Sequence, residues 1–361
     1  MKSTALLNTK TYQNTSQLLL RNLASIHGER LLVVNYPPDH FVLGLRQQWP
    51  ATQVTAFTHH YAPHQYLRDA YRTANLAAAD LVFAPAYAPT VERHDVGIVF
   101  LPKSRHLIEL TLAMVGAALA PGASCFLVGE NDAGIRSSGA LLEAQIGPVR
   151  TLDAARHCVL FQATKQVDAA PFDLDAWVTN YTLEIRQHTL NVISLPGVFS
   201  HGRLDEGTHL LLETLDYSQP TRVLDFGCGV GVIGATIQQA WPTNTVDMVD
   251  ENALALEAAR RTMQRNHLSM GAIKPSNVFS DIQETYTQII SNPPFHTGVK
   301  TDYRIVTTFL QQAAQHLDKG GTLRIVANSF LKYQPLIETH VGPCRLVAEN
   351  SSYRIYEGTR R

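Results

Sequence analysis

Short apolar runs rich in β-branched residues alternate along this chain with longer segments that have helical periodicity. Runs that are apolar at consecutive positions suit strands buried on both faces, and their alternation with helices is typical of βαβ units on a parallel sheet. We therefore predict an α/β fold with mostly parallel sheets. The predicted strands are residues 30–35, 53–58, 81–84, 96–101 and 124–128 in the first half, and 222–226, 245–250, 277–280, 288–291 and 322–327 in the second.

The two halves of the chain align with each other when one is shifted by 192 residues. Residues 30–32 then fall on 222–224, Val54 on Val246, and Pro102 on Pro294. A constant shift across several positions indicates duplication of one domain. We therefore predict two tandem Rossmann-like domains from an internal duplication, each ending in an antiparallel strand pair. In the second half this pair is residues 345–348 and 353–356.

A boundary between the two predicted domains lies near residues 165–175, where the periodicity lapses around Pro171. After it, residues 181–186 and 190–194 have the pattern of a hairpin that leads into the second domain. The first domain is therefore predicted to span residues 1–165 and the second residues 176–361.

Composition and charge exclude several classes of protein. Hydrophobic residues make up 45% of the 361 residues and charged residues 17%, which suits a globular chain. The chain has 30 basic and 31 acidic residues, and neither half carries a basic block, so an arginine-rich RNA coat is excluded. The four cysteines form no CxxC pair, and the first ten residues have no apolar run of signal-peptide length. We expect a monomer in a reducing cytoplasm, without a membrane span.

The first candidate for chemistry is a glycine-rich turn between a predicted strand and a predicted helix. Gly227, Gly229 and Gly231 allow a tight turn and a close approach to a ligand, because they have no Cβ. Asp225 precedes the turn and would suit a cationic group of the ligand. Asp250 ends the next strand, where a carboxylate can accept hydrogen bonds from both hydroxyls of a ribose. A generic nucleotide pocket remains an alternative.

The corresponding positions of the first half have lost these groups. Asn35, Pro37 and Asp39 replace the three glycines. Val33 and Thr58 replace the two carboxylates. We therefore predict that the first domain no longer binds the cofactor.

The second candidate is the segment Asn292-Pro293-Pro294-Phe295-His296, which follows a predicted strand. The side-chain oxygen of Asn292 and the carbonyl of Pro293 can together accept both hydrogens of a planar amine. Phe295 can stack on a flat ring. Such a pair would orient the lone pair of a conjugated amine toward an incoming methyl group. A structural Pro-Pro turn is the alternative.

Taken together, residues 225–231 (DFGCGVG) and 292–296 (NPPFH) resemble the class I S-adenosylmethionine methyltransferases that act on exocyclic or amide nitrogens. Most of the chain is similar to the bacterial family of 16S rRNA guanine-N2 methyltransferases called RsmC, including residues 128–131 and 195–200. The resemblance implies two methyltransferase-like domains, the first degenerate. It also implies S-adenosylmethionine as cofactor, and methylation of the guanine at position 1207 of 16S rRNA in the assembled small subunit.

The same resemblance assigns roles to individual residues. For the cofactor it implies Asp225, Gly227, Gly229 and Gly231 along the loop, Asp250 at the ribose, Asp281 at the adenine amino group and Phe199 as a cover. For the target base it implies Asn292, Pro293 and Phe295. Further candidates for substrate contact are His296, Lys300, Arg304, Lys103 and Arg105. No histidine spacing indicates a metal site, and Cys228 is interpreted as a small residue at a tight turn rather than as a nucleophile.

Two other functions stay open at this point. One is a methyltransferase for a glutamine side chain of a protein such as a release factor, although its motif usually has tyrosine where this chain has Phe295. The other is a non-catalytic rRNA-binding or assembly factor. The intact Asp225, Asp250 and Asn292 argue against the second of these.

Overall fold

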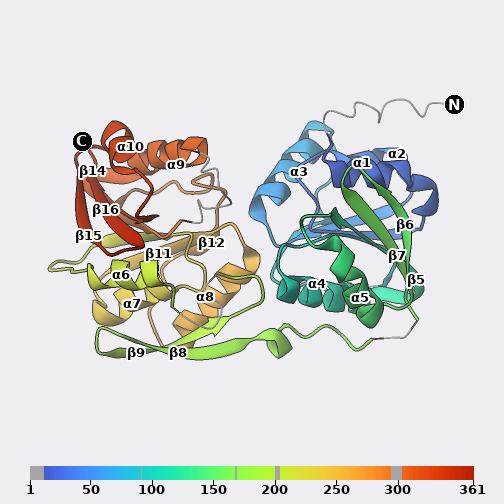
Figure 1. The fold of residues 1–361 in the computed structure, drawn as a ribbon, viewed down its shortest axis with the longest axis horizontal. Helices are drawn as coiled ribbons and strands as arrows, with labels where there is room; N and C mark the ends of the chain where they lie inside the picture. The colour runs from blue at the N-terminus through green and yellow to red at the C-terminus, as the bar shows by residue number, and fades with distance from the viewer. Residues whose placement is uncertain (1–11, 91, 167–168, 200–203, 294–302) are drawn as a thin grey trace. The chain divides into compact units, whose positions relative to one another are not determined.

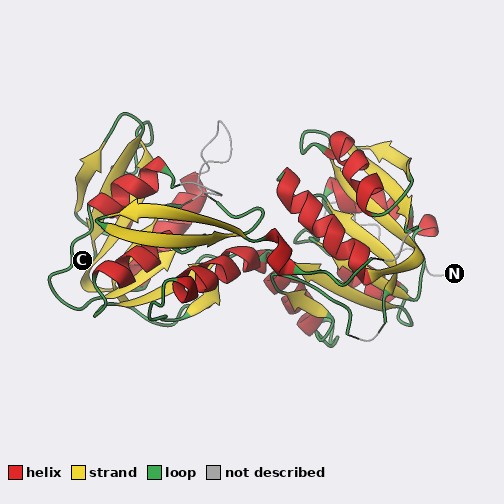
Figure 2. Cartoon of the chain, turned by 90° about the horizontal axis from the view of Figure 1, so that it is seen from below, coloured by secondary structure: helices red, strands yellow, loops and turns green. Residues whose placement is uncertain are grey.

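The computed structural model describes residues 12–90, 92–166, 169–199, 204–293 and 303–361, with the side chains of residues 303 and 304 left out. The chain divides into two compact units, Met1–Trp177 and Val178–Arg361 (Figure 1). Each unit has a sheet of mostly parallel strands with helices on both of its faces (Figure 2). The predicted α/β class is therefore confirmed.

The first unit forms a sheet in the order β3-β2-β1-β4-β5-β7-β6. Strands β3 to β5 are parallel, and β7 pairs antiparallel with both β5 and β6. Its elements are α1 (Asn14–Arg21), η2 (Leu23–Ser25), β1 (Arg30–Val34), α2 (Phe41–Gln48), β2 (Gln53–Thr58), α3 (Tyr61–Thr73), β3 (Leu81–Phe83), β4 (His94–Phe100), α4 (Arg105–Ala118), β5 (Leu119–Glu130), α5 (Ile135–Gln145), β6 (Val149–Ala155), β7 (Cys158–Thr164) and η3 (Leu174–Trp177).

The second unit repeats this topology in the order β12-β11-β10-β13-β14-β16-β15. The hairpin predicted before it is present as a separate antiparallel pair, β8 and β9. Its elements are β8 (Thr179–Ile185), β9 (His188–Ser194), α6 (Glu206–Glu213), β10 (Arg222–Phe226), α7 (Val232–Ala240), β11 (Thr245–Asp250), α8 (Ala253–Arg265), β12 (Ile273–Pro275), β13 (Tyr286–Ser291), α9 (Tyr303–Gln315), β14 (Leu317–Asn328), α10 (Gln334–His340), β15 (Cys344–Glu349) and β16 (Tyr353–Thr359).

Strand β1 shows why the strands are apolar at consecutive positions. Leu31 and Val33 join a core cluster that includes residues of α1, α2 and α3. Leu32 and Val34 join another cluster that includes residues of α4 and α5. Because alternate side chains of a strand point to opposite faces, helices on both faces bury every residue of such a strand.

The strand predicted at residues 277–280 is wrong. The strand beside β11 is Ile273–Pro275, which pairs in parallel with Met248–Asp250. Val278 has a φ of 54°, a left-handed conformation that is rare for a β-branched residue and incompatible with a strand. The Ser280 amide donates to the Asn277 carbonyl at 3.1 Å, which closes a turn. The apolar pair Val278-Phe279 belongs to this turn, and the side chain of Phe279 is buried.

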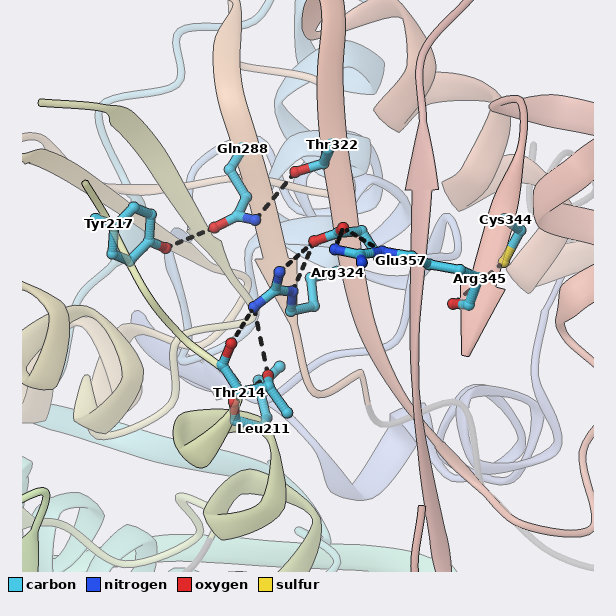
Figure 3. Close-up of polar contacts among 9 residues, drawn as sticks. All are labelled: Leu211, Thr214, Tyr217, Gln288, Thr322, Arg324, Cys344, Arg345 and Glu357. Carbon is cyan, nitrogen blue, oxygen red and sulfur yellow. Dashed lines mark hydrogen bonds and ion pairs between the residues drawn. The ribbon is translucent and has the colours of Figure 1, made fainter. Parts of the chain in front are cut away.

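Helix α6 is tied to the sheet of the second unit at its C-terminal end (Figure 3). Arg324 of β14 donates from Nη1 to the carbonyl of Thr214, the C-cap of α6, at 2.7 Å. The same guanidinium pairs with Glu357 of β16, with 2.9 Å from Nε to Oε2, and Arg345 donates to the other oxygen of Glu357 at 2.7 Å. Arg324 and Glu357 are both buried, so this network holds the end of α6 firmly.

Candidate active site

The three strands that carry the predicted motifs end side by side in the second unit. Strand β10 lies between β11 and β13 and is parallel to both, and Phe226 at its end is in register with Val249 and with Ser291. The residues that follow these strands therefore share the carboxyl edge of the sheet, at the point where the strand order reverses. This is the place where open α/β sheets bind their ligands.

The three glycines of the loop after β10 all have positive φ values, 70° at Gly227, 55° at Gly229 and 80° at Gly231. A Cβ added at Gly227 or Gly229 would have no heavy atom within 4 Å, so both face open space. A Cβ at Gly231 would lie 3.0 Å from the Cβ of Ala259 in α8. The first two glycines thus leave room for a ligand, while the third allows α7 and α8 to pack closely.

Asp250 lies beside the glycine loop and accepts a hydrogen bond from its backbone. Its Oδ2 accepts a hydrogen bond from the Gly229 amide at 2.9 Å, and its Oδ1 accepts one from the Asn252 amide at 2.9 Å. Burial raises the pKa of Asp250, and these two amides act in the opposite direction. Each carboxylate oxygen has a second lone pair, so both can still accept a ligand hydroxyl.

Asp225 has a contact that the sequence did not indicate. It is fully buried, and its Oδ2 accepts a hydrogen bond from the Gly234 amide in the first turn of α7 at 2.9 Å. Its Oδ1 has no hydrogen-bond partner among the described residues. Burial, with the nearby charge of Asp250, raises the pKa of Asp225 to about 7. The Asp225 carboxyl group therefore binds the first turn of α7 through one oxygen.

Asn292 follows β13, and both hydrogens of its amide group are taken by the protein. Its Nδ2 donates to Oδ2 of Asp205 at 2.9 Å and to Oγ1 of Thr208 at 2.8 Å. The side-chain oxygen of Asn292 therefore faces away from these two residues. The next residue, Pro293, is buried, and as a proline it has a backbone carbonyl but no backbone N–H group.

Sequence reasoning missed Asp205 and Thr208. The signal was present, because an aspartate just before a helix with a threonine three residues later is typical of a helix N-cap. Asp205 indeed caps α6, and its Oδ2 accepts from the Thr208 amide at 3.1 Å. What the local signal did not indicate is the contact with Asn292, which lies 87 residues further along the chain.

Other predicted site residues are placed as follows. Asp281 lies in the turn after β12, and its Oδ2 accepts from Ser280 Oγ at 2.5 Å. Phe199 is 61% exposed in the turn that follows β9. Lys103 and Arg105 are exposed at the start of α4, and Arg105 pairs with Glu109 at 3.0 Å. Phe295, His296 and Lys300 lie outside the described residues, as does the side chain of Arg304.

Cys228 is buried within the glycine loop, and burial raises the pKa of its thiol well above the ordinary value. A thiol that stays protonated is a poor nucleophile, which agrees with its interpretation as a small turn residue. Within the described ranges, histidine, cysteine and carboxylate side chains form no group of three or more that could hold a metal ion. No helix of that part of the chain is both long and apolar enough to cross a membrane.

The corresponding loop of the first unit resembles the glycine loop in part of its backbone but carries different side chains. Asn35, in place of the first glycine, has a φ of 55° and donates to the Phe57 carbonyl at 2.9 Å, just as Gly227 donates to Val249. The next residue, Tyr36, is buried in the core cluster. Asp39 accepts a hydrogen bond from the Gln13 amide at 3.0 Å, which brings the start of α1 onto this loop.

Comparison with known proteins decides the family. Residues 16–181 match the family described as "Methyltransferase small domain N-terminal", and residues 189–357 match "Methyltransferase small domain". "Ribosomal RNA small subunit methyltransferase C" of Stutzerimonas stutzeri is 40% identical over 346 residues, which cover 96% of this chain and 98% of that protein. The chain belongs to the ribosomal RNA small subunit methyltransferase C family. The family member of Ectopseudomonas mendocina is 42% identical, over 96% of this chain and 99% of its own.

A solved structure with this family's fold supports the architecture. It is the T. thermophilus 16S rRNA N2 G1207 methyltransferase (RsmC), in complex with AdoMet and guanosine. Its TM-score to this chain is 0.82 at 23% identity, and the match covers 98% of this chain and 93% of that one. The predicted arrangement of two methyltransferase-like units in tandem is therefore confirmed for this member of the family.

Proposed function

We propose that this chain transfers a methyl group from S-adenosylmethionine to the exocyclic N2 of a guanine in 16S rRNA. The observation that carries the proposal is the orientation of the Asn292 amide, whose oxygen is left for a substrate at the sheet edge that also bears the glycine loop. The relatives named above act, by their name, on small-subunit rRNA. The T. thermophilus protein is named as a methyltransferase of N2 of G1207 in 16S rRNA, and we extend the proposal to that position, with the small ribosomal subunit as substrate.

The cofactor would lie over the glycine loop, with its ribose hydroxyls on Asp250. The open space in front of Gly227 and Gly229 fits this placement, because any larger residue would fill it. Gly231 and Asp225 would act from behind, by holding α7 and the loop in place. We propose that Asp281 accepts a hydrogen bond from the adenine amino group. We propose that Phe199, whose ring is exposed, covers the bound cofactor.

Bound S-adenosylmethionine supplies an electrophilic methyl group. The amine at N2 of guanine is a weak nucleophile, since its lone pair is delocalised into the ring. The oxygen of Asn292 and the carbonyl of Pro293 would accept its two hydrogens and so direct the lone pair toward the methyl group. Both acceptors are uncharged, so they work by orientation and electrostatics rather than as a strong base. The proton that the amine loses passes to water.

The remaining predicted residues concern the RNA. A guanine in folded rRNA must be turned out of its stack before its amine can reach such a site. We assign Phe295 to stacking on the base, His296 to shaping the pocket, and Lys300 and Arg304 to phosphate contacts.

The predicted first domain, residues 1–165, would serve docking rather than catalysis. In its loop the positions of the glycines hold Asn35, Pro37 and Asp39, and Asp39 accepts a hydrogen bond from the Gln13 amide, which supports the absence of a second cofactor site. Lys103 and Arg105 stand where the second unit has its base pocket, and both are exposed. We propose that they contact RNA phosphates, while residues 176–361 carry the reaction.

The test is transfer of a tritiated methyl group to purified 16S rRNA, to small ribosomal subunits and to a release factor, assayed in parallel. Nucleoside analysis of the labelled RNA should identify N2-methylguanine, and primer extension should locate it. Label on the release factor alone would replace the rRNA proposal with a protein substrate. No transfer to any of the three, with cofactor binding shown by calorimetry, would contradict the assigned substrate.

A further inference from the structure

The side chains of Asp205, Thr208 and Asn292 are linked by hydrogen bonds at the edge of the second sheet. Asp205 Oδ2 accepts from Asn292 Nδ2 at 2.9 Å and lies 3.5 Å from Thr208 Oγ1. Thr208 Oγ1 accepts from Asn292 Nδ2 at 2.8 Å. The threonine hydroxyl can therefore donate to the carboxylate while it accepts from the amide.

The carboxylate decides which way the amide of Asn292 points. An ionised carboxylate can only accept hydrogen bonds, so the group that faces Asp205 must be the NH₂ of Asn292. A rotated amide would place its oxygen against the Asp205 carboxylate, which has no hydrogen to donate, and would leave the amide hydrogens without these partners. The charged acceptor also makes a stronger hydrogen bond than a neutral one.

We propose that Asp205, assisted by Thr208, is a positioning residue that fixes the Asn292 oxygen toward the target amine. This inference rests on the proposed role of Asn292 as an acceptor for that amine. Asp205 itself would touch neither the base nor the cofactor. It would act by keeping the acceptor in its productive orientation before the substrate arrives.

The packing of helix α6 fixes the position of the Asp205 carboxylate. A Cβ at Gly207 would lie 2.8 Å from Val326 and 2.9 Å from Tyr353, so only glycine allows the first turn of α6 to approach β14 and β16 this closely. At the other end, Arg324 anchors the carbonyl of Thr214 (Figure 3).

The test compares variants that keep the helix cap but change the contact with Asn292. Asp205→Ser keeps a favoured N-cap residue and removes the carboxylate. Thr208→Val removes the hydroxyl with little change of shape. Thr214→Val is the control for loss of a hydroxyl at the far end of α6, because Thr214 Oγ1 bonds to Leu211 and Arg324 and not to Asn292. Single-turnover methyl transfer to small subunits, cofactor affinity by calorimetry and melting temperature are measured for each.

We expect Asp205→Ser to lower the single-turnover rate about 10- to 100-fold, as for a reacting group displaced by about 1 Å, while cofactor affinity stays near wild type. Thr208→Val should lower the rate more than Thr214→Val. In an Asn292→Ala background, Asp205→Ser should cause no further loss, because residues that act through one another are not additive.

Independent losses that multiply in the double variant would overturn the positioning role, as would a folded Asp205→Ser enzyme with the wild-type rate. If Asp205→Ser does not fold, Asp205→Asn, which keeps the size and the cap, takes its place with the same expected direction. A wild-type rate for Asn292→Ala would instead refute the proposed function of Asn292, so the two failures are distinguishable.

Discussion

Alanine substitutions in the glycine loop should separate cofactor binding from stability. Gly229 has a φ of 55° and Gly231 a φ of 80°, so alanine at either position would carry the strain of a left-handed backbone, about 1–2 kcal/mol. At Gly229 the added methyl group meets no protein atom within 4 Å. At Gly231 it lies 3.0 Å from Ala259, which adds an overpacking cost of about 1–3 kcal/mol. We therefore expect Gly231→Ala to destabilise the second unit more than Gly229→Ala.

Cofactor affinity should follow the opposite order. If the space before Gly229 holds the cofactor, the new methyl group must overlap it, and a similar cost of about 1–3 kcal/mol raises Kd about 5- to 150-fold. Gly231→Ala leaves that space open, so its Kd should change less at temperatures where the protein is folded. Gly227→Ala should behave as Gly229→Ala does, since its added methyl group also meets open space.

The measurements are isothermal titration with S-adenosylmethionine and urea unfolding followed by circular dichroism. A chain of two units need not unfold in one step, so the transition of the second unit is identified by its shift when cofactor is added. Gly227→Ala and Gly229→Ala proteins that are folded and bind the cofactor with wild-type affinity would show that the open space is not the cofactor's. The same conclusion would follow if Gly231→Ala were the variant that lost affinity most.

Four further results are expected. Asp250→Ala should raise the Kd for the cofactor at least a hundredfold, since two charge-assisted hydrogen bonds of about 1.5–3 kcal/mol each are lost; a change in turnover alone would argue against the ribose contact. Burial raises the pKa of Asp225 from 3.8 to about 7, so between these pH values the native state holds a proton that the unfolded chain releases. The free energy of unfolding should therefore fall as pH rises from about 4 to about 7. Asp225→Asn should lessen that fall in urea unfolding at pH 5 and pH 8, and equal slopes for both proteins would count against a raised pKa. Calorimetry on the intact chain should give one cofactor per chain, and a second site would mean that the first unit still binds. Lys103→Glu combined with Arg105→Glu should weaken binding to small ribosomal subunits and leave cofactor affinity unchanged. The wild-type protein should show a shallow salt dependence of this binding. Undiminished binding by a folded variant would exclude this docking surface.

The sequence was sufficient for most strands, because burial on both faces makes them apolar throughout. It failed where composition and conformation disagree. Val278 and Phe279 have strand-like side chains, but Val278 adopts a φ of 54° and the pair lies in a turn. The real strand, Ile273–Pro275, is short and contains a lysine and a proline. The internal repeat indicated it, since a shift of 192 residues carries Leu81–Phe83 onto these three residues.

The candidate site was predictable to the extent that it is local. The spacing of the glycines and of Asp250 follows from one strand-turn-helix unit and the strand beside it. The partner of Asn292 was not predictable in this way, because Asp205 lies 87 residues earlier and reaches it only through the packing of α6. The burial of Asp225 is likewise a property of the folded unit. Its spacing predicts a ligand contact, and the structure adds a hydrogen bond from the Gly234 amide of α7 that the sequence did not indicate.

The altered loop of the first unit constrains what evolution or engineering can do with it. Asn35 has the left-handed conformation that Gly227 has in the second unit, so the two loops share this feature of the backbone. Asp39, however, has become an attachment point for the segment before α1, through its bond to the Gln13 amide. Replacing Asp39 with glycine would therefore remove the hydrogen bond that ties the start of α1 to this loop. The position that corresponds to Gly231 thus stabilises the first unit, so a change made there to create a binding loop would also cost stability.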